Sequence, residues 1–377
     1  MKKLALLLGY DAAGSTAFKL VAGELVNRDY EVDLLVGNGQ QMSVTDEELE
    51  ERVKKADAVF LYMSTTAERA RIEILAANLA KKYGKPYGFY GDIVQCWGRA
   101  RPGAWFEPVA ADAAFYCGVN EEDSQAAGAV FPNAMLFGTG NPVREDWHFP
   151  KTTYKEVRET LGIDDDTFMV LLSLNKQAAH NTATMLSVFR ALSRLITDAD
   201  GKKHPEWYRL VIGLHPGDPQ YPVKLEEEAA DPTTPEGLLR YLELLELCPV
   251  PVTFMRKGDT RTSDLVPGAD IVVGLGSAVE LEAAFQGKPV ITYGFEQPFR
   301  LIETANGTRN LENVSSGASE LVVASVDKFT EAMRRLLTRQ GYEPMRARQA
   351  ALFPKPKERG TAVRNIANVL EVFLPKH

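Results

Sequence analysis

Small residues and carboxylates follow an apolar run in the segment 269–291, where a ligand could bind. The run ends in a Gly-Leu-Gly-Ser turn at residues 274–277, and the amphipathic stretch that follows carries Glu280 and Glu282 in its first turns. A strand that passes through such a turn into a helix directs backbone N–H groups at a phosphate. We therefore expect Gly276 and Ser277 to approach a phosphate group, although an ordinary βαβ unit would give the same pattern.

Two further polar groups follow apolar runs in the second half of the chain. Asn175 and Lys176 come directly after residues 168–172, and His215-Pro216-Gly217 comes after residues 210–214. In doubly wound sheets, ligands bind at the carboxyl ends of the strands. Lys176 could reach a diphosphate or be a solvated surface lysine. We expect His215 to contact the ligand, because packing alone does not explain a histidine there.

The first half of the chain offers two carboxylates at comparable places. Asp11 lies in the small-residue loop 9–15, together with Gly14, and Asp92 follows the run 87–90. A carboxylate at a strand end is well placed for acid–base catalysis. Asp11 and Asp92 are therefore the candidate catalytic residues. A tight turn between strand and helix, and a helix N-cap at Asp92, are the structural alternatives.

The sequence gives no sign of a metal site. It has five histidines and three cysteines, Cys96, Cys117 and Cys248, and none of these residues are at the spacing of metal ligands. Widely separated cysteines in odd number are typical of reduced thiols in a cytosolic protein. We expect no cofactor and no bound metal.

Short apolar runs alternate with amphipathic stretches almost from end to end. In the first half, strands are predicted at residues 4–8, 32–36, 58–63, 87–90, 115–117 and 134–137, and helices at 15–28, 45–55 and 67–82. Ser15 is the expected N-cap of the first helix. Strands that alternate with helices predict a parallel sheet covered on both faces.

The glycines and prolines of residues 138–150 interrupt this alternation and suit a domain linker. It then restarts. Strands are predicted at residues 168–172, 210–214, 252–254, 271–273 and 289–293, and helices at 153–161, 182–196, 235–247, 279–286, 326–339 and 361–373. We expect an N-terminal acceptor-side domain over 1–145, a nucleotide-sugar-binding domain over 146–355, and a C-terminal helix in 356–377 that crosses back to the first domain.

Composition limits the classes of partner. The 377 residues carry a formal net charge of -8, which argues against general binding to nucleic acid. The apolar run after Met1-Lys2-Lys3 is too short for a signal peptide, and no stretch reaches the ~20 apolar residues of a membrane span. We expect a cytoplasmic protein without a transmembrane segment, which could still touch a membrane surface.

The segment from Glu282 to Val290 resembles the nucleotide-binding region of GT-B glycosyltransferases and of the UDP-N-acetylglucosamine 2-epimerases, which share their fold. Glu282-Ala283 followed by Gly287-Lys288-Pro289-Val290 fits the spacing of that region. The opening loop, the Gly140-Asn141-Pro142 segment and His215-Pro216 are also similar. The resemblance implies an α/β fold with two Rossmann-like doubly wound domains (GT-B type) facing a central cleft.

By the same resemblance, Glu282 would bind the ribose hydroxyls, and Gly276 and Ser277 would approach the diphosphate. The sequence also departs from these families. Many retaining transferases have a second Glu at the position of Gly274, and the epimerases have Gly-Asp-Thr where this chain has Gly91-Asp92-Ile93. Further acidic catalytic residues of the epimerases are not recognisable.

The leading hypothesis is a GT-B glycosyltransferase, inverting and metal-independent, which transfers a sugar from a nucleotide-sugar, expected to be UDP-linked, to an unknown acceptor. Asp11 or Asp92 would be the base, and Gly14, Asn175, Lys176, His215, Gly276, Ser277, Glu280 and Glu282 would bind the nucleotide-sugar. The alternatives are a UDP-sugar 2-epimerase-like enzyme and a non-catalytic nucleotide-binding protein. Fold alone does not decide among them.

Overall fold

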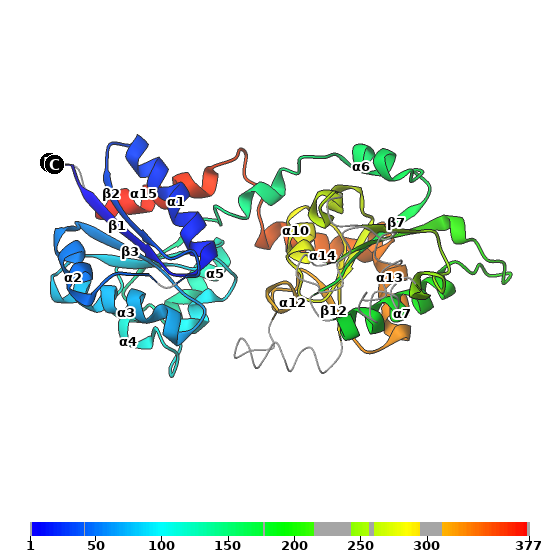
Figure 1. Ribbon diagram of the computed structural model, residues 1–377, viewed down its shortest axis with the longest axis horizontal. Helices are drawn as coiled ribbons and strands as arrows, with labels where there is room; N and C mark the ends of the chain where they lie inside the picture. Colours follow the sequence, from blue (N-terminus) through cyan, green and yellow to red (C-terminus); the bar gives the residue numbers. More distant parts are fainter. Residues whose placement is uncertain are drawn as a thin grey trace, which may run out of the picture. The chain divides into compact units, whose positions relative to one another are not determined.

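The computed structural model describes residues 2–40, 42–175, 178–214, 243–255, 260–294 and 311–374. The chain divides into two compact units. Unit 1 consists of Met1–Phe149 and Pro354–His377, and unit 2 of Pro150–Phe353. Each unit has its own parallel sheet flanked by helices (Figure 1). The alternation predicted from the sequence therefore gives two doubly wound α/β domains.

The sheet of unit 1 has the strand order β2-β1-β3-β4-β5-β6. Its strands are β1 (Leu4–Gly9), β2 (Glu31–Val36), β3 (Ala58–Tyr62), β4 (Tyr87–Tyr90), β5 (Phe115–Gly118) and β6 (Met135–Gly138). The order reverses between β1 and β3, which pair in register from Ala5 opposite Ala58 to Leu8 opposite Leu61. Loops leave the sheet toward opposite faces at such a switch point, so a ligand can bind between them.

The helices of unit 1 come from both ends of the chain. They are α1 (Ala12–Asn27), α2 (Asp46–Lys55), α3 (Ala67–Lys82), α4 (Glu107–Ala110), α5 (Glu121–Ala126) and α15 (Thr361–Phe373), with short 3-10 helices η1 (Cys96–Ala100), η2 (Ala127–Ala129) and η3 (Glu145–His148). Helix α15 packs beside α1, and Ile366 and Leu370 belong to the same buried cluster as Phe18 and Phe60.

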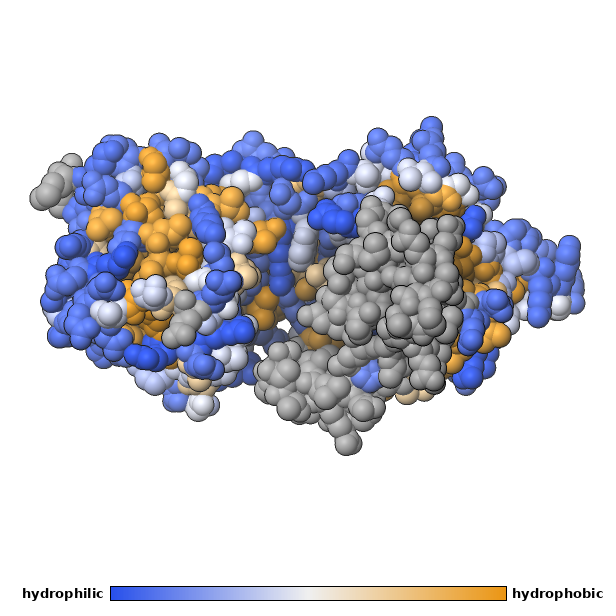
Figure 2. All heavy atoms as spheres, viewed as in Figure 1, coloured by the Kyte–Doolittle hydropathy of each residue, from blue (hydrophilic) through white to orange (hydrophobic). Residues whose placement is uncertain are grey.

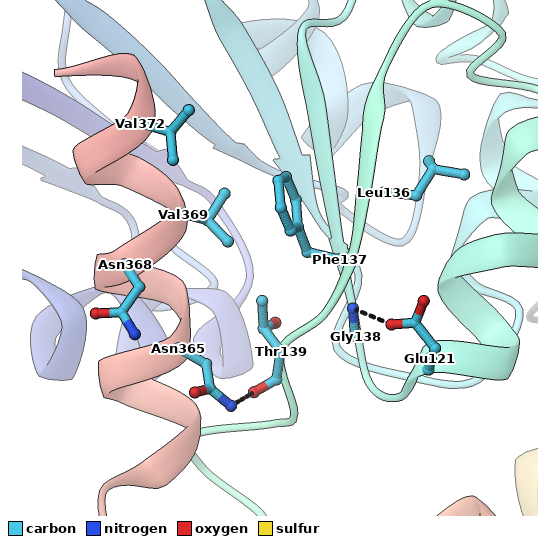
Figure 3. Close-up of a pocket in the computed structure, with 9 residues that line it drawn as sticks. All are labelled: Glu121, Leu136, Phe137, Gly138, Thr139, Asn365, Asn368, Val369 and Val372. Carbon is cyan, nitrogen blue, oxygen red and sulfur yellow. Dashed lines mark hydrogen bonds between the residues drawn. The ribbon is translucent and has the colours of Figure 1, made fainter. Parts of the chain in front are cut away.

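On the face of the molecule shown in Figure 2, many of the coloured residues are hydrophilic, and apolar residues are exposed over part of unit 1. At the edge of the sheet, a groove of about 530 Å³ runs between β6 and α15 (Figure 3). The Glu121 carboxylate accepts a hydrogen bond from the backbone N–H of Gly138 at 3.3 Å, and Asn365 donates to the carbonyl of Thr139 at 3.3 Å. These contacts satisfy backbone groups that an edge strand leaves unpaired.

The sheet of unit 2 has the strand order β12-β11-β10-β7-β8-β9. Its strands are β7 (Phe168–Ser173), β8 (Tyr208–Gly213), β9 (Val252–Met255), β10 (Ile271–Gly274), β11 (Val290–Gly294) and β12 (Glu320–Val323). Read in reverse, this is the order of the dinucleotide-binding fold, with its switch point between β7 and β10. Register pairs Ser173 with Gly274, so the residues after both strands emerge side by side.

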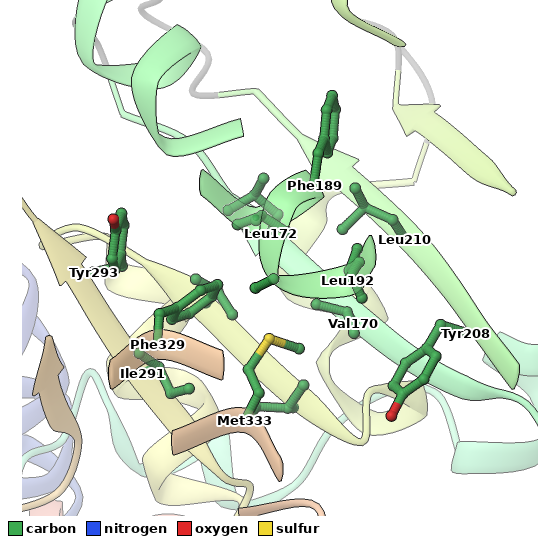
Figure 4. Packing of buried hydrophobic residues seen from close by; sticks show 14 of the residues in the cluster. Val170, Leu172, Phe189, Leu192, Tyr208, Leu210, Ile291, Tyr293, Phe329 and Met333 are labelled. Atoms are coloured by element: carbon green, nitrogen blue, oxygen red, sulfur yellow. The ribbon is translucent and has the colours of Figure 1, made fainter. Parts of the chain in front are cut away.

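The described helices of unit 2 include α6 (Tyr154–Leu161), α7 (Ala178–Leu195), α10 (Ala278–Phe285), α12 (Glu312–Ser315), α13 (Val326–Leu336) and α14 (Arg339–Leu352), with the 3-10 helices η4 (Pro205–Trp207) and η5 (Thr262–Gly268). Phe189 and Leu192 of α7 and Phe329 and Met333 of α13 pack on the same face of the sheet (Figure 4). Central strands such as β7 and β10 are nearly continuous apolar runs, because the strands of a parallel sheet are buried on both faces.

Some predicted elements differ from the structure. Helix α1 begins at Ala12 with Asp11 as N-cap, three residues before the predicted start. Ser15 does not cap it, because its buried hydroxyl donates to the Gly9 carbonyl at 3.4 Å and accepts from the backbone N–H of Asn38 at 2.9 Å. The helix predicted over 326–339 ends at Leu336, and α14 begins anew after its N-cap Thr338.

Strand β12 was not predicted, because its apolar run is short, from Leu321 to Val323, and follows a charged residue; only Val322 of the strand is buried. The predicted helix 235–247 lies largely outside the described residues. Within the ranges that the structure describes, no helix combines the length and apolar character needed to cross a membrane.

Candidate functional site

The switch point of unit 2 brings together the ends of β7 and β10. The hydroxyls of Ser173 and Ser277 lie 2.9 Å apart. Gly276 has φ +71°, a left-handed conformation that favours glycine, and it lets the chain turn sharply from β10 into α10. The turn predicted from residues 274–277 therefore stands at the strand end where ligands of this fold class bind.

Ser277 and Glu280 form a capping box at the start of α10. The Ser277 hydroxyl accepts from the backbone N–H of Val279 at 3.2 Å, and the Glu280 carboxylate accepts from the backbone N–H of Ser277 at 2.7 Å. Two of the donors expected to face a phosphate are thus engaged within the helix end. For the backbone N–H of Ala278, the described residues provide no acceptor.

Glu280 is fully buried behind this turn. Besides Ser277, it accepts hydrogen bonds from the Thr292 hydroxyl at 2.6 Å and from the Asn313 amide at 3.1 Å. Burial raises the pKa of Glu280 to about 7, against these hydrogen bonds, which lower it. The sequence predicted Glu280 to be a ligand-binding residue, whereas in the structure its carboxylate points into the interior of unit 2.

The carboxylate of Glu280 also explains the departure at Gly274. A Cβ atom on Gly274 would lie 2.7 Å from Glu280 Oε2, so no side chain fits there without displacing Glu280.

Glu282 differs from Glu280 although it lies only two residues along α10. It is half-buried, and its carboxylate makes no hydrogen bond within the described residues. Burial raises its pKa to about 7, Asp264 adds to the rise, and Arg261 opposes it. A half-buried carboxylate without a hydrogen-bonding partner can accept hydrogen bonds from a ligand.

Asn175 follows β7 at the same edge of the sheet. Its backbone is fixed by Asn181 of α7, whose side chain accepts from the Asn175 N–H at 3.0 Å and donates to the Asn175 carbonyl at 2.8 Å. The structure therefore brings Asn175, Gly276 and Ser277 to one edge. The other two predicted residues of this group, Lys176 and His215, lie outside the described residues.

Asp11 connects the loops at the switch point of unit 1. Its carboxylate accepts from the backbone N–H of Thr65 at 2.8 Å, after β3, and from the Arg69 guanidinium of α3 at 3.0 Å. Both oxygens of Asp11 are thus engaged in joining the loops after β1 and β3. Gly14 packs below them, where an added Cβ would meet the ring of Tyr62 at 2.4 Å. Close packing of α1 on β3 requires a glycine at this position.

Asp92 lies after β4 and is buried. Its carbonyl accepts from the Asn141 amide at 2.7 Å, while the side-chain oxygen Oδ1 has no hydrogen-bonding partner in the described structure. Arg99 of η1 donates to the carbonyl of Met63 and is close enough to Asp92 to be affected by its charge. Burial acts against the charge of Arg99, but Cys96 and Asp92 outweigh it, so that the pKa of Arg99 is raised.

Sequence reasoning missed Glu73 of α3. This residue is fully buried, and its Oε1 accepts from the backbone N–H of Tyr10 at 3.0 Å and from the Ser64 hydroxyl at 2.5 Å, while Oε2 has no partner among the described residues. Burial raises the pKa of Glu73 to about 8. Its position in the sequence could have indicated that it is buried, because Glu73 lies at helical spacing from Ala70 and Ala77, which are on the buried side of α3.

Within the described ranges, no group of three or more His, Cys, Asp or Glu side chains could hold a metal ion. In the described part of unit 1, Asp11 joins the loops after β1 and β3 through both of its oxygens, whereas Asp92 and Glu73 each keep one buried carboxylate oxygen without a hydrogen-bonding partner.

No protein-family model matches the sequence, and a search of curated proteins found no match. Solved structures do match it. A Listeria monocytogenes protein assigned as a UDP-N-acetylglucosamine 2-epimerase has a TM-score of 0.58 at 14% identity, covering 100% of this chain and 98% of that chain. The UDP-GlcNAc 2-epimerase of Neisseria meningitidis, bound to UDP-GlcNAc, gives 0.54 at 14% identity, with 97% and 99% covered.

HepE of Anabaena in complex with UDP matches similarly, with a TM-score of 0.52 at 13% identity over 98% of this chain and 100% of that chain. These likenesses extend over the whole length of the chain, and at such identities they establish the fold. The chain has the GT-B fold, with two Rossmann-like α/β domains, as in the UDP-N-acetylglucosamine 2-epimerases.

Proposed function

We propose that this protein is an enzyme acting on a UDP-linked sugar, which it binds at the switch point of unit 2. The observation that carries the proposal is Glu282, a half-buried carboxylate without a hydrogen-bonding partner in the described residues, on the helix that follows the Gly276-Ser277 turn. A carboxylate there can accept hydrogen bonds from both hydroxyls of a ribose. Structures of the same fold bound to UDP and to UDP-GlcNAc support this choice of ligand.

The diphosphate would be held by the start of α10. The N-terminal end of a helix carries partial positive charge, which favours an anion there. The backbone N–H of Ala278 is the donor that the capping box of Ser277 and Glu280 leaves for it. Asn175, across the switch point, would contribute from the end of β7.

For the reaction, we favour epimerisation of the sugar over transfer, because the structures that match the whole chain include UDP-GlcNAc 2-epimerases. Epimerisation requires a group that removes a proton from a sugar carbon and a group that returns one to the opposite face. Asp92 would take one of these roles, since its Oδ1 has no hydrogen-bonding partner in the described part of the chain.

Glycosyl transfer with inversion is the second candidate, and one observation favours it. Of the two predicted catalytic carboxylates, Asp11 is engaged by Thr65 and Arg69, which leaves Asp92 as the better base. Inverting transfer needs a single base to deprotonate the acceptor hydroxyl, so one carboxylate would suffice.

The test is to incubate the protein with a panel of UDP-sugars in deuterated water, with and without sugar acceptors, in the presence of a chelator, and to analyse the products by NMR. An altered sugar that carries deuterium and forms without acceptor supports epimerisation. Release of UDP only with an acceptor supports transfer. Binding without turnover supports a non-catalytic protein, and absence of binding to every UDP-sugar contradicts the proposal.

A further inference from the structure

Asn141 joins the loop that carries Asp92 to the segment that follows β6. Its buried side chain donates through the amide nitrogen to the Asp92 carbonyl at 2.7 Å. The side-chain oxygen of Asn141 accepts from the backbone N–H groups of Val143 at 2.9 Å and of Arg144 at 3.1 Å. One side chain therefore ties the loop after β4 to a turn that lies 49 residues further along the chain.

The turn at Asn141 is itself anchored. The backbone N–H of Glu145 donates to the Asn141 carbonyl at 2.9 Å. The Glu145 carboxylate in turn accepts from the backbone N–H of Thr361 at 3.0 Å and from that of Ala362 at 2.5 Å, at the start of α15. The segment from Asn141 to Glu145 is therefore attached to α15, which gives Asn141 a fixed place from which to hold the Asp92 loop.

The backbone around Asp92 is held at two places. Before it, the backbone N–H of Gly91 donates to the Cys117 carbonyl of β5 at 2.9 Å, and the carbonyl of Asp92 itself accepts from Asn141. The rotamers that a side chain can adopt depend on its backbone conformation. A fixed backbone therefore limits the positions of the Asp92 carboxylate, whose buried Oδ1 has no hydrogen-bonding partner among the described residues.

We propose that Asn141 is a positioning residue, whose amide N–H orients the Asp92 carboxylate for the acid–base step on the sugar. The inference rests on the function proposed above and goes beyond it by assigning a residue that acts on the base through its main chain, without contact with the substrate. A side chain that only stabilised the turn would need its oxygen for Val143 and Arg144 but not its amide N–H for the loop after β4.

The experiment measures turnover of UDP-GlcNAc by NMR and UDP affinity by calorimetry in Asn141→Asp. A carboxylate has the size of the amide and can still accept from Val143 and Arg144, but it has no N–H to offer to the Asp92 carbonyl. Misplacement of a catalytic group by about 1 Å can cost about 10²-fold in rate. We therefore expect kcat to fall by about tenfold to a hundredfold, with UDP affinity unchanged because the proposed nucleotide site is in unit 2.

Asn141→Ala separates loss of the N–H from the added negative charge, and its kcat should fall to a similar extent; Asn141→Asp tests the inference if Asn141→Ala does not fold. A double-mutant cycle then distinguishes positioning from a general structural role. If Asn141 acts through the Asp92 carboxylate, Asn141→Ala should not lower the residual turnover of Asp92→Asn any further. The matched control is Asn133→Ala, since Asn133 donates in the same way to the Ala111 carbonyl of unit 1 at 2.8 Å, and this variant should keep the wild-type kcat.

The inference is overturned if the Asn141 variants turn over as fast as Asn133→Ala, if the losses in the double-mutant cycle are additive, or if UDP affinity falls together with kcat. A crystal structure of Asn141→Asp tests it without turnover: the Asp92 carbonyl should turn away from residue 141 and move the carboxylate with it, and an unmoved Asp92 also overturns the inference. If the wild-type protein converts neither UDP-GlcNAc nor another UDP-sugar, the proposed function fails and the inference with it, whereas unaffected variants of an active protein overturn the inference alone.

Discussion

At the scale of the residue, Glu282 is the first test of the nucleotide site. Its carboxylate is half-buried and makes no hydrogen bond in the described structure, so Glu282→Ala removes no contact that the fold needs. Hydrogen bonds to a charged group contribute roughly 1.5–3 kcal/mol each. We expect Glu282→Ala to weaken UDP binding about tenfold or more, measured by calorimetry.

The control for this experiment is Glu331→Ala. Glu331 is an exposed glutamate of α13 in the same unit, and its loss should leave UDP affinity unchanged. Glu280, the nearer glutamate, cannot serve as a control because it is buried and accepts hydrogen bonds from Ser277, Thr292 and Asn313, among others. If Glu282→Ala binds UDP as tightly as Glu331→Ala, the ribose assignment is wrong.

Asp92 is the residue on which turnover should depend. The substitution Asp92→Asn keeps the side-chain volume and the hydrogen bond from Asn141 to the Asp92 carbonyl, and removes the base. General acid–base groups contribute roughly 10²–10⁴-fold to rate, so we expect a loss of turnover of that size with little change in UDP affinity. Asp11→Asn provides the comparison, and equal losses of turnover for both variants would contradict the assignment to Asp92.

Glu73 should make the stability of unit 1 depend on pH. Its folded-state pKa is about 8, above the ordinary value of 4.5, so the folded state retains the proton that the unfolded state loses. The contribution to stability is complete below about pH 4.5 and is lost as the pH rises through about 8. Glu73→Gln should abolish this fall, as measured by urea denaturation in a Trp207→Phe background that leaves tryptophans only in unit 1. Parallel pH curves for the two proteins would contradict it.

Among site residues, those that follow strands could be found from the sequence. Asp11, Asp92, Asn175 and Ser277 all lie at strand ends, as the apolar runs before them indicate. The sequence pattern does not show which atoms of these residues remain available to a ligand. The partners of Asp11 are more than fifty residues away in the chain, so its engagement by Thr65 and Arg69 follows from the tertiary fold alone.

At the scale of the element, patterns with strong periodicity or uninterrupted apolar runs predicted structure well. Helices α3 and α15 and strand β4 have the predicted bounds. The predicted elements were wrong where tertiary contacts determine the start of a helix or the formation of a strand. Ser15 has the residue type of an N-cap, but the loop of Asn38 takes its hydroxyl and the helix starts earlier. Strand β12 forms because β11 offers an edge to pair with, although its own pattern is weak.

Two glycines in helices should respond to alanine in opposite directions. Gly23 lies in the interior of α1, and an added Cβ would meet nothing within 4 Å. Gly162 ends α6 at φ +61°, where a Cβ is strained even though space is open. Gly23→Ala should raise the free energy of unfolding by roughly 0.8–1 kcal/mol, and Gly162→Ala should lower it by about 1–2 kcal/mol. Urea denaturation of the two variants checks both signs, and a stabilising Gly162→Ala would contradict the left-handed cap.

At the scale of the whole molecule, the sequence indicated two successive α/β units because the alternation of strands and helices stops near residue 140 and restarts. It could not indicate the strand orders. Each sheet has a crossover at a switch point, and the pairs β1–β3 and β7–β10 join strands that are not neighbours in the chain. Such pairing depends on which helices cover each face, which an apolar run alone does not encode.

The last prediction concerns the return of the chain to unit 1. Helix α15 lies at the C-terminal end of the sequence, yet Leu370 is fully buried in the core of unit 1, and Phe373 stacks on Phe115 of β5 at 4.4 Å. Unit 1 therefore cannot complete its core until α15 has been made. Leu370→Ala should destabilise it by about 2–5 kcal/mol.

Val372 of the same helix is the matched control for this substitution. It is 56% exposed, so Val372→Ala should change the free energy of unfolding by about 0.5 kcal/mol or less. Unfolding of unit 1 is followed by tryptophan fluorescence in the Trp207→Phe background, while UDP binding by calorimetry reports on unit 2. Because unit 2 has its own core, Leu370→Ala should lower the stability of unit 1 and leave UDP affinity unchanged. Equal stability of the two variants would show that α15 is not an integral part of unit 1.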